Sequence, residues 1–341
     1  MKSEESKYFG MGRRVMLLSF FILYSSLFTH AQSRWAKLRD KADSILAERY
    51  AKGGYDTAYL SRPRHKITAK VRINVAGNMI KSRGEADGVS YESDLSTELR
   101  GTVSLGASYR GLGVSLSLNP GKLSGLNKDF VLNLNYYTRL FSLDVSYQDS
   151  KTLHGEFSSG DNTIYLDAGM VRMKVLDIAG FYAFNNRRYS FPAAFTQSYI
   201  QKHSAGSWLA GLSYQGGSIK TDGDSDKGIP SLRMYVGNLA IGGGYGYNIV
   251  TNNRHWMFHL SAIPMLIVLK KSNVTVNDER RDVEYKFPEM MFHQRLAIVY
   301  NINERNFIAL SAMFDIYAYR TSATEVMNNK WNSHLCYGIR F

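Results

Sequence analysis

The chain is poor in three features that normally organise a protein of 341 residues. It has one cysteine, Cys336, and six prolines, and a single cysteine excludes a disulfide within the chain. Beyond residues 15–28, the best continuous apolar run is 262–269, far shorter than the roughly 20 residues of a membrane-spanning helix. Yet the chain contains 23 Tyr and 17 Phe, with a mean hydropathy of -0.27. The apolar residues must therefore be interspersed with polar ones, which favours a β-rich protein.

Acidic residues are also scarce. Lys and Arg number 42 against 29 Asp and Glu, a formal net charge of +13. Because the N-terminus described next predicts export, we do not expect a nucleic-acid partner. The excess suits anionic lipopolysaccharide, outer-membrane lipid or small anionic solutes.

The first 31 residues have the pattern of a secretory signal peptide. Arg13 and Arg14 precede the apolar run 15–28, and Ala31 provides a small residue for cleavage. The alternative is a membrane anchor, for which the run is short. Translation from Met1 or from Met11 stays open.

Residues 32–66 differ from the rest of the chain. Apolar residues from Trp35 to Leu46 alternate with charges at a helical period. Gly53-Gly54 ends this predicted amphipathic helix, and an irregular connector leads to Pro63. We expect the segment to form a periplasmic N-terminal arm.

From Ile67 to Phe341 the period becomes two. Twelve segments alternate apolar with polar residues, each near the ~9–11 residues of a tilted membrane-spanning strand. A sheet in lipid must close, because an open edge leaves backbone groups unpaired. The pattern predicts an all-β fold, a closed antiparallel transmembrane β-barrel of about 12 strands over residues 67–341. A soluble β-sandwich is the competing architecture.

Connection lengths agree with a barrel. Tight turns near 110–111, 139–140, 252–253 and 303–305 alternate with long polar loops, as in barrels with short periplasmic turns. An even strand count places both termini in the periplasm. The stretch 186–204 is too long and too aromatic for a turn, so we expect it to fold into the lumen or to dock on the arm.

Few residues suggest catalysis. His259 and Ser261 would share one face of a strand, so His259 could act as a base for Ser261. Some outer-membrane lipid hydrolases have this spacing, but the Asn-Gly that follows there is replaced by Ala262-Ile263. No metal site or cofactor is expected, since the eight His residues are scattered along the chain. The Asp222–Asp226 loop resembles the start of a calcium loop but lacks the distal Glu of an EF-hand.

Charged residues on the predicted inner face form a larger set. A basic-lined pore would select anionic solutes, whereas a salt-bridged interior would conduct nothing. The predicted lumen-lining charges are Lys70, Arg72, Arg100, Arg139, Arg295, Arg340, Glu98, Asp144 and Asp315.

Three stretches, 55–63, 67–74 and 189–207, resemble the exported family known as domain of unknown function 4421. That resemblance implies an outer-membrane barrel of a Bacteroides-type Gram-negative bacterium and carries no established activity or site residues. The terminal Phe341 resembles the signal by which the barrel-assembly machinery recognises its clients.

The sequence favours a non-enzymatic protein, either a narrow porin-like channel with a basic-lined lumen or a barrel that binds envelope components. A lipid hydrolase using Ser261 and His259 is one alternative. A structural anchor acting through the 32–66 arm is the other.

Overall fold

A computed structural model describes residues 53–86, 89–109, 112–118, 121, 129–223, 231–276, 279–282, 287–320 and 324–341, with five isolated positions between 40 and 48. The chain divides into two units, Met1–Gly53 and Gly54–Phe341. The predicted signal peptide lies outside the described residues, as does most of the Asp222–Asp226 loop. The five positions in the arm are helical and exposed, too few to test the predicted helix. Among the described residues, no helix is both long and apolar enough to cross a membrane.

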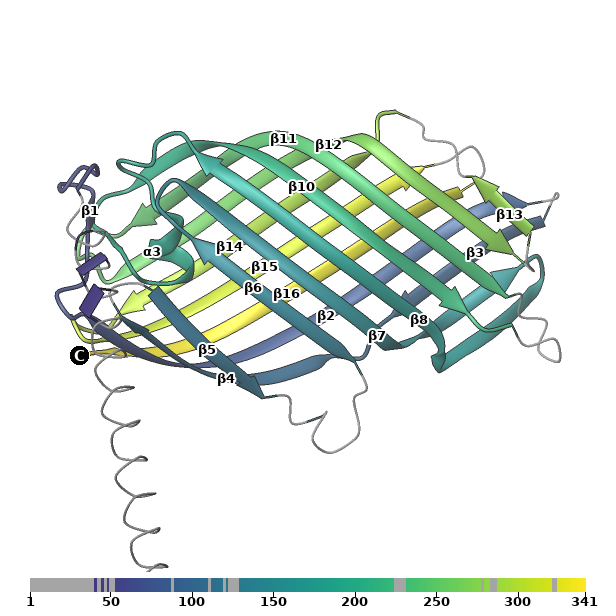
Figure 1. The fold of residues 1–341 in the computed structure, drawn as a ribbon, viewed down its shortest axis with the longest axis horizontal. Coiled ribbons are helices and arrows are strands. Elements are labelled where there is room, and N and C mark those ends of the chain that lie inside the picture. The colour runs from purple at the N-terminus through teal and green to yellow at the C-terminus, as the bar shows by residue number, and fades with distance from the viewer. Residues whose placement is uncertain are drawn as a thin grey trace, which may run out of the picture. The chain divides into compact units, whose positions relative to one another are not determined.

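Ten strands of the second unit close into an antiparallel ring (Figure 1). The closing pair joins the first and last of them, with Thr68 opposite Arg340. This pair closes the ring. In ring order the strands are β2 (Ile67–Ala86), β3 (Val89–Ser96), β7 (Phe141–Ser159), β8 (Asn162–Ala183), β10 (Ala205–Thr221), β11 (Leu232–Val250), β12 (Trp256–Val276), β14 (Met290–Asn301), β15 (Asn306–Arg320) and β16 (Thr324–Arg340).

Three extra strands lie in one half of the wall. There β4 (Arg100–Tyr109) takes the place of β3 beside β2, β5 (Leu112–Leu118) pairs with β4, and β6 (Phe130–Tyr137) pairs with β7. A short strand, β13 (Glu279–Asp282), extends the other end of the barrel from β12. The prediction of about twelve strands in one ring is therefore not confirmed. Two of the predicted segments, β5 and β6, are half-length strands outside the ring of ten.

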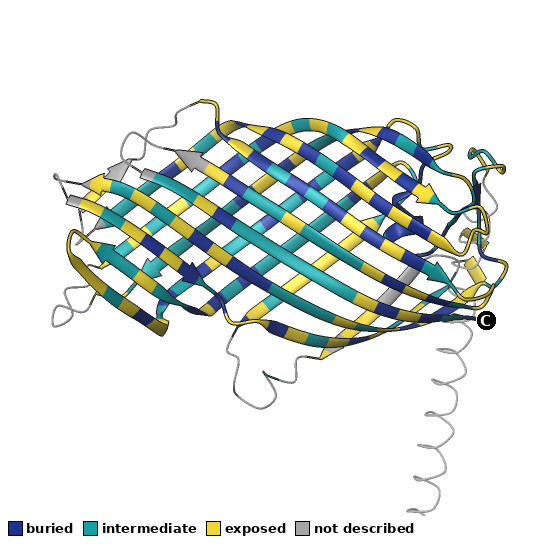
Figure 2. Cartoon of the chain, turned by 180° about the vertical axis from the view of Figure 1, so that it is seen from behind, coloured by how far each residue is buried: buried dark blue, intermediate teal, exposed yellow. Residues whose placement is uncertain are grey.

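Alternation along each strand separates an apolar outer face from an inner face (Figure 2). In β12, Phe258 and Leu260 are exposed, whereas His259 and Ser261 are 3% and 0% exposed. The same alternation places Ile241, Leu310 and many other large apolar side chains on the outside. Such a surface is far larger than a soluble protein normally exposes.

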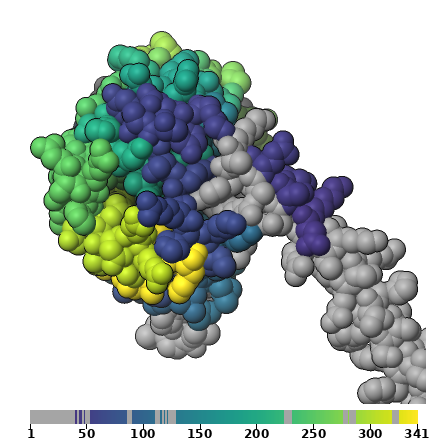
Figure 3. Space-filling model, turned by 90° about the vertical axis from the view of Figure 1, so that its left-hand side faces the viewer, coloured from purple at the N-terminus to yellow at the C-terminus, as the bar shows by residue number. Residues whose placement is uncertain are grey.

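One end of the barrel, called here the terminal end, holds Ile67, Phe341 and the short turns. It also holds a folded segment, residues 185–204, called here the plug. Within it are the helix α3 (Phe191–Phe195) and the strand β9 (Ile200–Gln201), which pairs with β1 (Leu60–Ser61). Seen from this end, residues from Gly54 onward lie across the mouth of the barrel (Figure 3). The expectation that 186–204 enters the lumen or meets the arm is confirmed in both respects.

Candidate functional site

Ion pairs cross the middle of the barrel. Arg295 on β14 places Nη2 2.9 Å from Asp144 Oδ2 on β7 and Nη1 3.6 Å from Asp315 Oδ1 on β15. In the ring of ten, β7 and β14 lie opposite each other. His293 Nδ1 lies 2.6 Å from the same Asp315 oxygen. The Arg295 side chain, only 2% exposed, thus ties opposite walls together.

A second group extends this charge layer. Lys330 on β16 donates to Asp177 Oδ2 on β8 at 2.6 Å and to Ser146 Oγ at 2.8 Å. Gln215 donates to the other Asp177 oxygen at 2.9 Å. Five charged side chains of the charge layer are only 2% to 21% exposed, so their ion pairs lie inside the barrel.

Between the charge layer and the plug lies a chain of three hydrogen-bonded side chains. His259 Nε2 is 3.1 Å from Ser261 Oγ, and His259 Nδ1 is 2.7 Å from Asn248 Oδ1 on the neighbouring strand β11. Asn248 Nδ2 donates to the carbonyl of Ser190 and to Gln201 Oε1, at 3.1 and 3.0 Å. Since its amide nitrogen is thus used, Asn248 Oδ1 accepts from His259 Nδ1–H, leaving Nε2 to accept from the Ser261 hydroxyl.

The plug covers this chain. The rings of Phe191 and Phe195 lie 5.7 and 5.1 Å from the His259 ring, centroid to centroid. Tyr189 is fully buried, and its hydroxyl has no hydrogen-bond partner in the described part of the chain. Burial raises the pKa of the Tyr189 phenol well above its usual range. Neither His259 nor Ser261 is open to solvent or lipid in this arrangement.

Cations of the inner wall also hold the plug. Lys70 donates to the Thr196 carbonyl and, at 3.5 Å, to Gln197 Oε1. Lys70 and Arg340 flank the buried ring of Phe307, 5.9 and 4.5 Å from its centroid. Arg72, two residues along β2 on the same face, is half-buried.

Two of the predicted lumen charges lie elsewhere. Arg139 is in the turn between β6 and β7, where it donates to the carbonyls of Gly54 and Asn186. Glu98 is exposed, because residues 97–99 interrupt the alternation between β3 and β4. The contacts of Arg139 are with turns, and Glu98 leaves the inner face at the strand break. Arg100 stays on the inner face of β4, buried 3.7 Å from Asp129, a residue just before β6.

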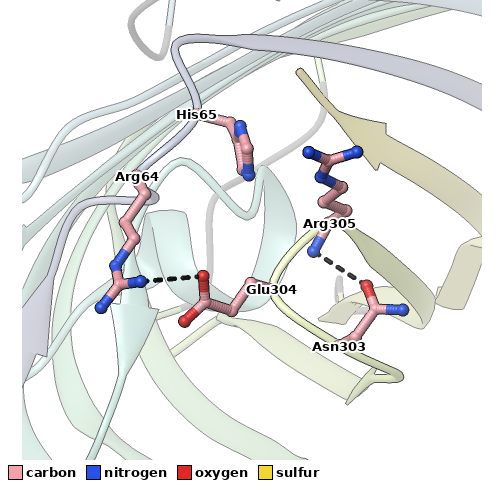
Figure 4. Close-up of a pocket in the computed structure, with 5 residues that line it drawn as sticks. All are labelled: Arg64, His65, Asn303, Glu304 and Arg305. Carbon is pink, nitrogen blue, oxygen red and sulfur yellow. Dashed lines mark hydrogen bonds and ion pairs between the residues drawn. The ribbon is translucent and has the colours of Figure 1, made fainter.

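A hollow of about 530 Å³ opens at the terminal end, called here the terminal hollow. Figure 4 shows Arg305 and His65 extending into it from opposite sides, while Arg64 extends toward Glu304. Arg64 Nη1 is 3.2 Å from Glu304 Oε2, and Asn303 completes the lining by accepting from the Arg305 backbone N–H at 2.9 Å. No sequence motif indicated this site, because it joins the turn before β15 to the segment before β2.

Fold and interior together define a closed β-barrel with a plugged terminal end. The chain belongs to the family described as Domain of unknown function (DUF4421), whose model matches residues 54–341. This match confirms the resemblance found in the sequence. No curated protein sequence matched the chain.

Three solved structures resemble the chain at low identity. They are the outer membrane protease OmpT from Escherichia coli (7% identity, 82% of this chain and 98% of that chain, TM-score 0.45), the translocator domain of the autotransporter NalP from Neisseria meningitidis (8%, 91% and 98%, 0.33) and the outer membrane protein OprG from Pseudomonas aeruginosa (11%, 82% and 99%, 0.28). At these TM-scores the likeness carries no argument about function.

Several partners in the interior were missed by sequence reasoning. Lys330 and His293 fall on the inner face by alternation, but nothing in the sequence pairs Lys330 with Asp177 or His293 with Asp315. Asn248 joins His259 only through the register of β11 and β12, which places the two residues directly opposite. Alternation identifies the face of a residue, and ring position and register identify its partner.

Proposed function

We propose that this protein is an outer-membrane β-barrel with a plugged, net-basic interior, which binds envelope components rather than acting as an enzyme or an open pore. The large exposed apolar surface on its strands supports a location in lipid. We place it in the outer membrane of a Gram-negative bacterium, with both termini in the periplasm. Phe341, which is 61% exposed, is the proposed contact for the barrel-assembly machinery.

One observation carries the closed-barrel proposal: two barriers lie in series along the barrel. The Arg295 charge layer links opposite walls, and the plug seals the terminal end through Phe191 and Tyr189, both 0% exposed. A solute would have to break buried ion pairs and displace a packed segment. The narrow anion-preferring channel is therefore the less favoured alternative, and it requires both barriers to move.

We predict that the refolded wild-type protein shows no steady single-channel conductance in a planar bilayer. A variant with residues 190–199 replaced by Gly and Ser, combined with Arg295→Ser, Asp144→Asn and Asp315→Asn, should conduct with anion preference, because Lys70, Arg72 and Lys330 then line the open path and the two carboxylates are neutralised. Heat-modifiable mobility in gels checks that each protein is folded. Steady conductance from the folded wild type would contradict the closed-barrel proposal and favour the channel.

A second candidate function, hydrolysis of lipid esters, is supported by the hydrogen-bonded order Ser261–His259–Asn248. His259 Nε2 is placed to accept the Ser261 proton while Asn248 orients the ring, the arrangement required of an activated serine nucleophile. Against it stands the burial of all three side chains, between 0% and 3% exposed. The same bonds serve equally to satisfy polar groups beneath the plug.

The hydrolase alternative predicts covalent labelling of Ser261 by a fluorophosphonate probe once the plug segment 190–199 is replaced by Gly and Ser. Ser261→Ala in that background removes the labelling, and Ser213→Ala, another buried serine on the inner face, is the matched control that retains it. The favoured proposal expects no labelling of any of these proteins, detected by intact-mass spectrometry. Specific labelling of Ser261 would favour the lipid hydrolase over the closed-barrel proposal.

A further inference from the structure

The terminal end carries an unusual charge distribution. Among its described turns and segments, a single acidic side chain, Glu304, is exposed. The opposite end mixes both signs, as the exposed pair Lys81–Asp94 illustrates. The terminal end exposes six cationic side chains, Arg64, Lys66, Arg187, Arg188, Arg254 and Arg305.

The terminal hollow gathers part of this charge into a concave site. Two guanidinium groups, one imidazole and a single carboxylate line it, with Arg64 directed at Glu304 and the Arg305 guanidinium on the side of His65 (Figure 4). The Arg64–Glu304 pair is 82% and 65% exposed, and such an exposed ion pair contributes little and exchanges easily. A bound phosphate that approaches Arg305 and His65 can also accept hydrogen bonds from Arg64, because Arg64 uses only Nη1 for Glu304 and a guanidinium has five N–H donors. Glu304 repels the phosphate only weakly while this pair is kept.

Exposed apolar residues adjoin the residues that line the hollow, along the chain or through backbone pairing. Ile67 follows the Arg64–His65 stretch and is 48% exposed, and Ile302 precedes Asn303 and is 40% exposed. Phe341 pairs with Ile67 through backbone hydrogen bonds of 2.8 and 3.2 Å, and it is 61% exposed. The hollow thus lies at the boundary between the basic terminal end and the apolar outer face, where lipid headgroups meet acyl chains in a membrane.

We propose that the terminal hollow binds the phosphate of a membrane phospholipid from the leaflet at the terminal end, with its acyl chains against Ile67, Ile302 and Phe341. A bidentate guanidinium suits a phosphate, and the adjoining apolar residues favour an amphiphile over a free ion. The proposal rests on the proposed membrane location and gives the envelope-binding role a specific ligand class and site.

The test is native mass spectrometry of the full-length barrel, released from bilayers that contain phosphatidylglycerol and phosphatidylcholine. We expect selective retention of phosphatidylglycerol by the wild type. The double variant Arg64→Gln/Arg305→Gln should lose about tenfold in retention, equivalent to ~1.4 kcal/mol. The control Arg233→Gln, an exposed cation near the opposite end, should retain the lipid.

Unchanged retention by the double variant, or an equal loss in the control, would overturn the site. A titration with inorganic phosphate distinguishes the source of the ligand chemistry: half-displacement at a phosphate concentration no higher than that of the lipid would identify an ion site and reject the lipid, because only the lipid can also contact the apolar residues. Flotation with the same vesicles separates this proposal from the membrane location. Failure to float contradicts the location, whereas floating protein without selective retention contradicts only the headgroup site.

Discussion

Replacing Arg295 with methionine is expected to lower the free energy of unfolding by about 3–5 kcal/mol, the usual cost of breaking a buried ion pair from one side. Asp144 and Asp315 would lose their shared cation while staying mostly enclosed, at 14% and 21% exposure. Methionine fills most of the volume of the arginine stem, so the loss reports charge rather than an empty cavity. Urea unfolding in detergent micelles, followed by tryptophan fluorescence, measures the change.

The triple variant Arg295→Met/Asp144→Asn/Asp315→Asn provides the matched control for this prediction. With the carboxylates neutralised together with the guanidinium, more than half of the lost stability should return, since neither Asp144 nor Asp315 is then left as a carboxylate without its cation. Arg233→Met, on the exposed surface of β11, should change stability by less than about 0.5 kcal/mol. A loss below about 1 kcal/mol in Arg295→Met would show that the charge layer is hydrated and contributes little to stability.

Substituting Gly246 with valine is expected to loosen the plug. A Cβ at this position would lie 2.4 Å from the Tyr189 hydroxyl and 3.2 Å from Leu209 Cδ1. Because Tyr189 is fully buried, its ring has no free space to enter and must push the plug outward. Overpacking of this kind costs about 1–3 kcal/mol. We expect trypsin to cleave at the exposed Arg187 and Arg188 about tenfold faster, because local opening of the plug limits the cleavage.

Gly101→Val is the matched control, because a Cβ at Gly101 meets no atom within 4 Å. Its cleavage rate should equal that of the wild type. Fragment masses locate the cut, so accelerated cleavage confined to the long loops of the opposite end would contradict the assignment. An unchanged rate at Arg187 and Arg188 would mean that Tyr189 does not hold the plug in place.

Sequence alternation predicted the fold because lipid and interior impose opposite preferences on successive residues. Along β12, the apolar Phe258 and Leu260 and the polar His259 and Ser261 separate as expected. The number of strands in the ring was harder to predict from the alternation than the fold. The pattern through 95–109 reads as one strand, yet its break at residues 97–99 divides it into β3 and β4. Nothing in the alternation of 112–118 or 130–137 reveals that these segments span only half the wall.

Within the candidate site, only contacts between residues close in sequence were predictable. The pairing of His259 with Ser261 follows from a spacing of two, which the strand period fixes. Arg295 and Asp144 were both placed on the inner face, but their contact depends on the number of strands between them. Arg139 was predicted to line the lumen because it continues the alternation of β6 by residue number. The chain has already turned at Thr138, so Arg139 lies in the turn instead.

The half-strands have a mechanical consequence. Barrel diameter grows with strand number, and β4, β5 and β6 occupy the terminal half where β3 alone stands in the other. The interior therefore narrows away from the terminal end, and the plug sits on the wide side of that taper with the charge layer beneath it. A displacement of the plug into the barrel therefore meets the narrowing wall and the charge layer, whereas an outward displacement must break the β1–β9 pair and the hydrogen bond of Lys70 to Thr196.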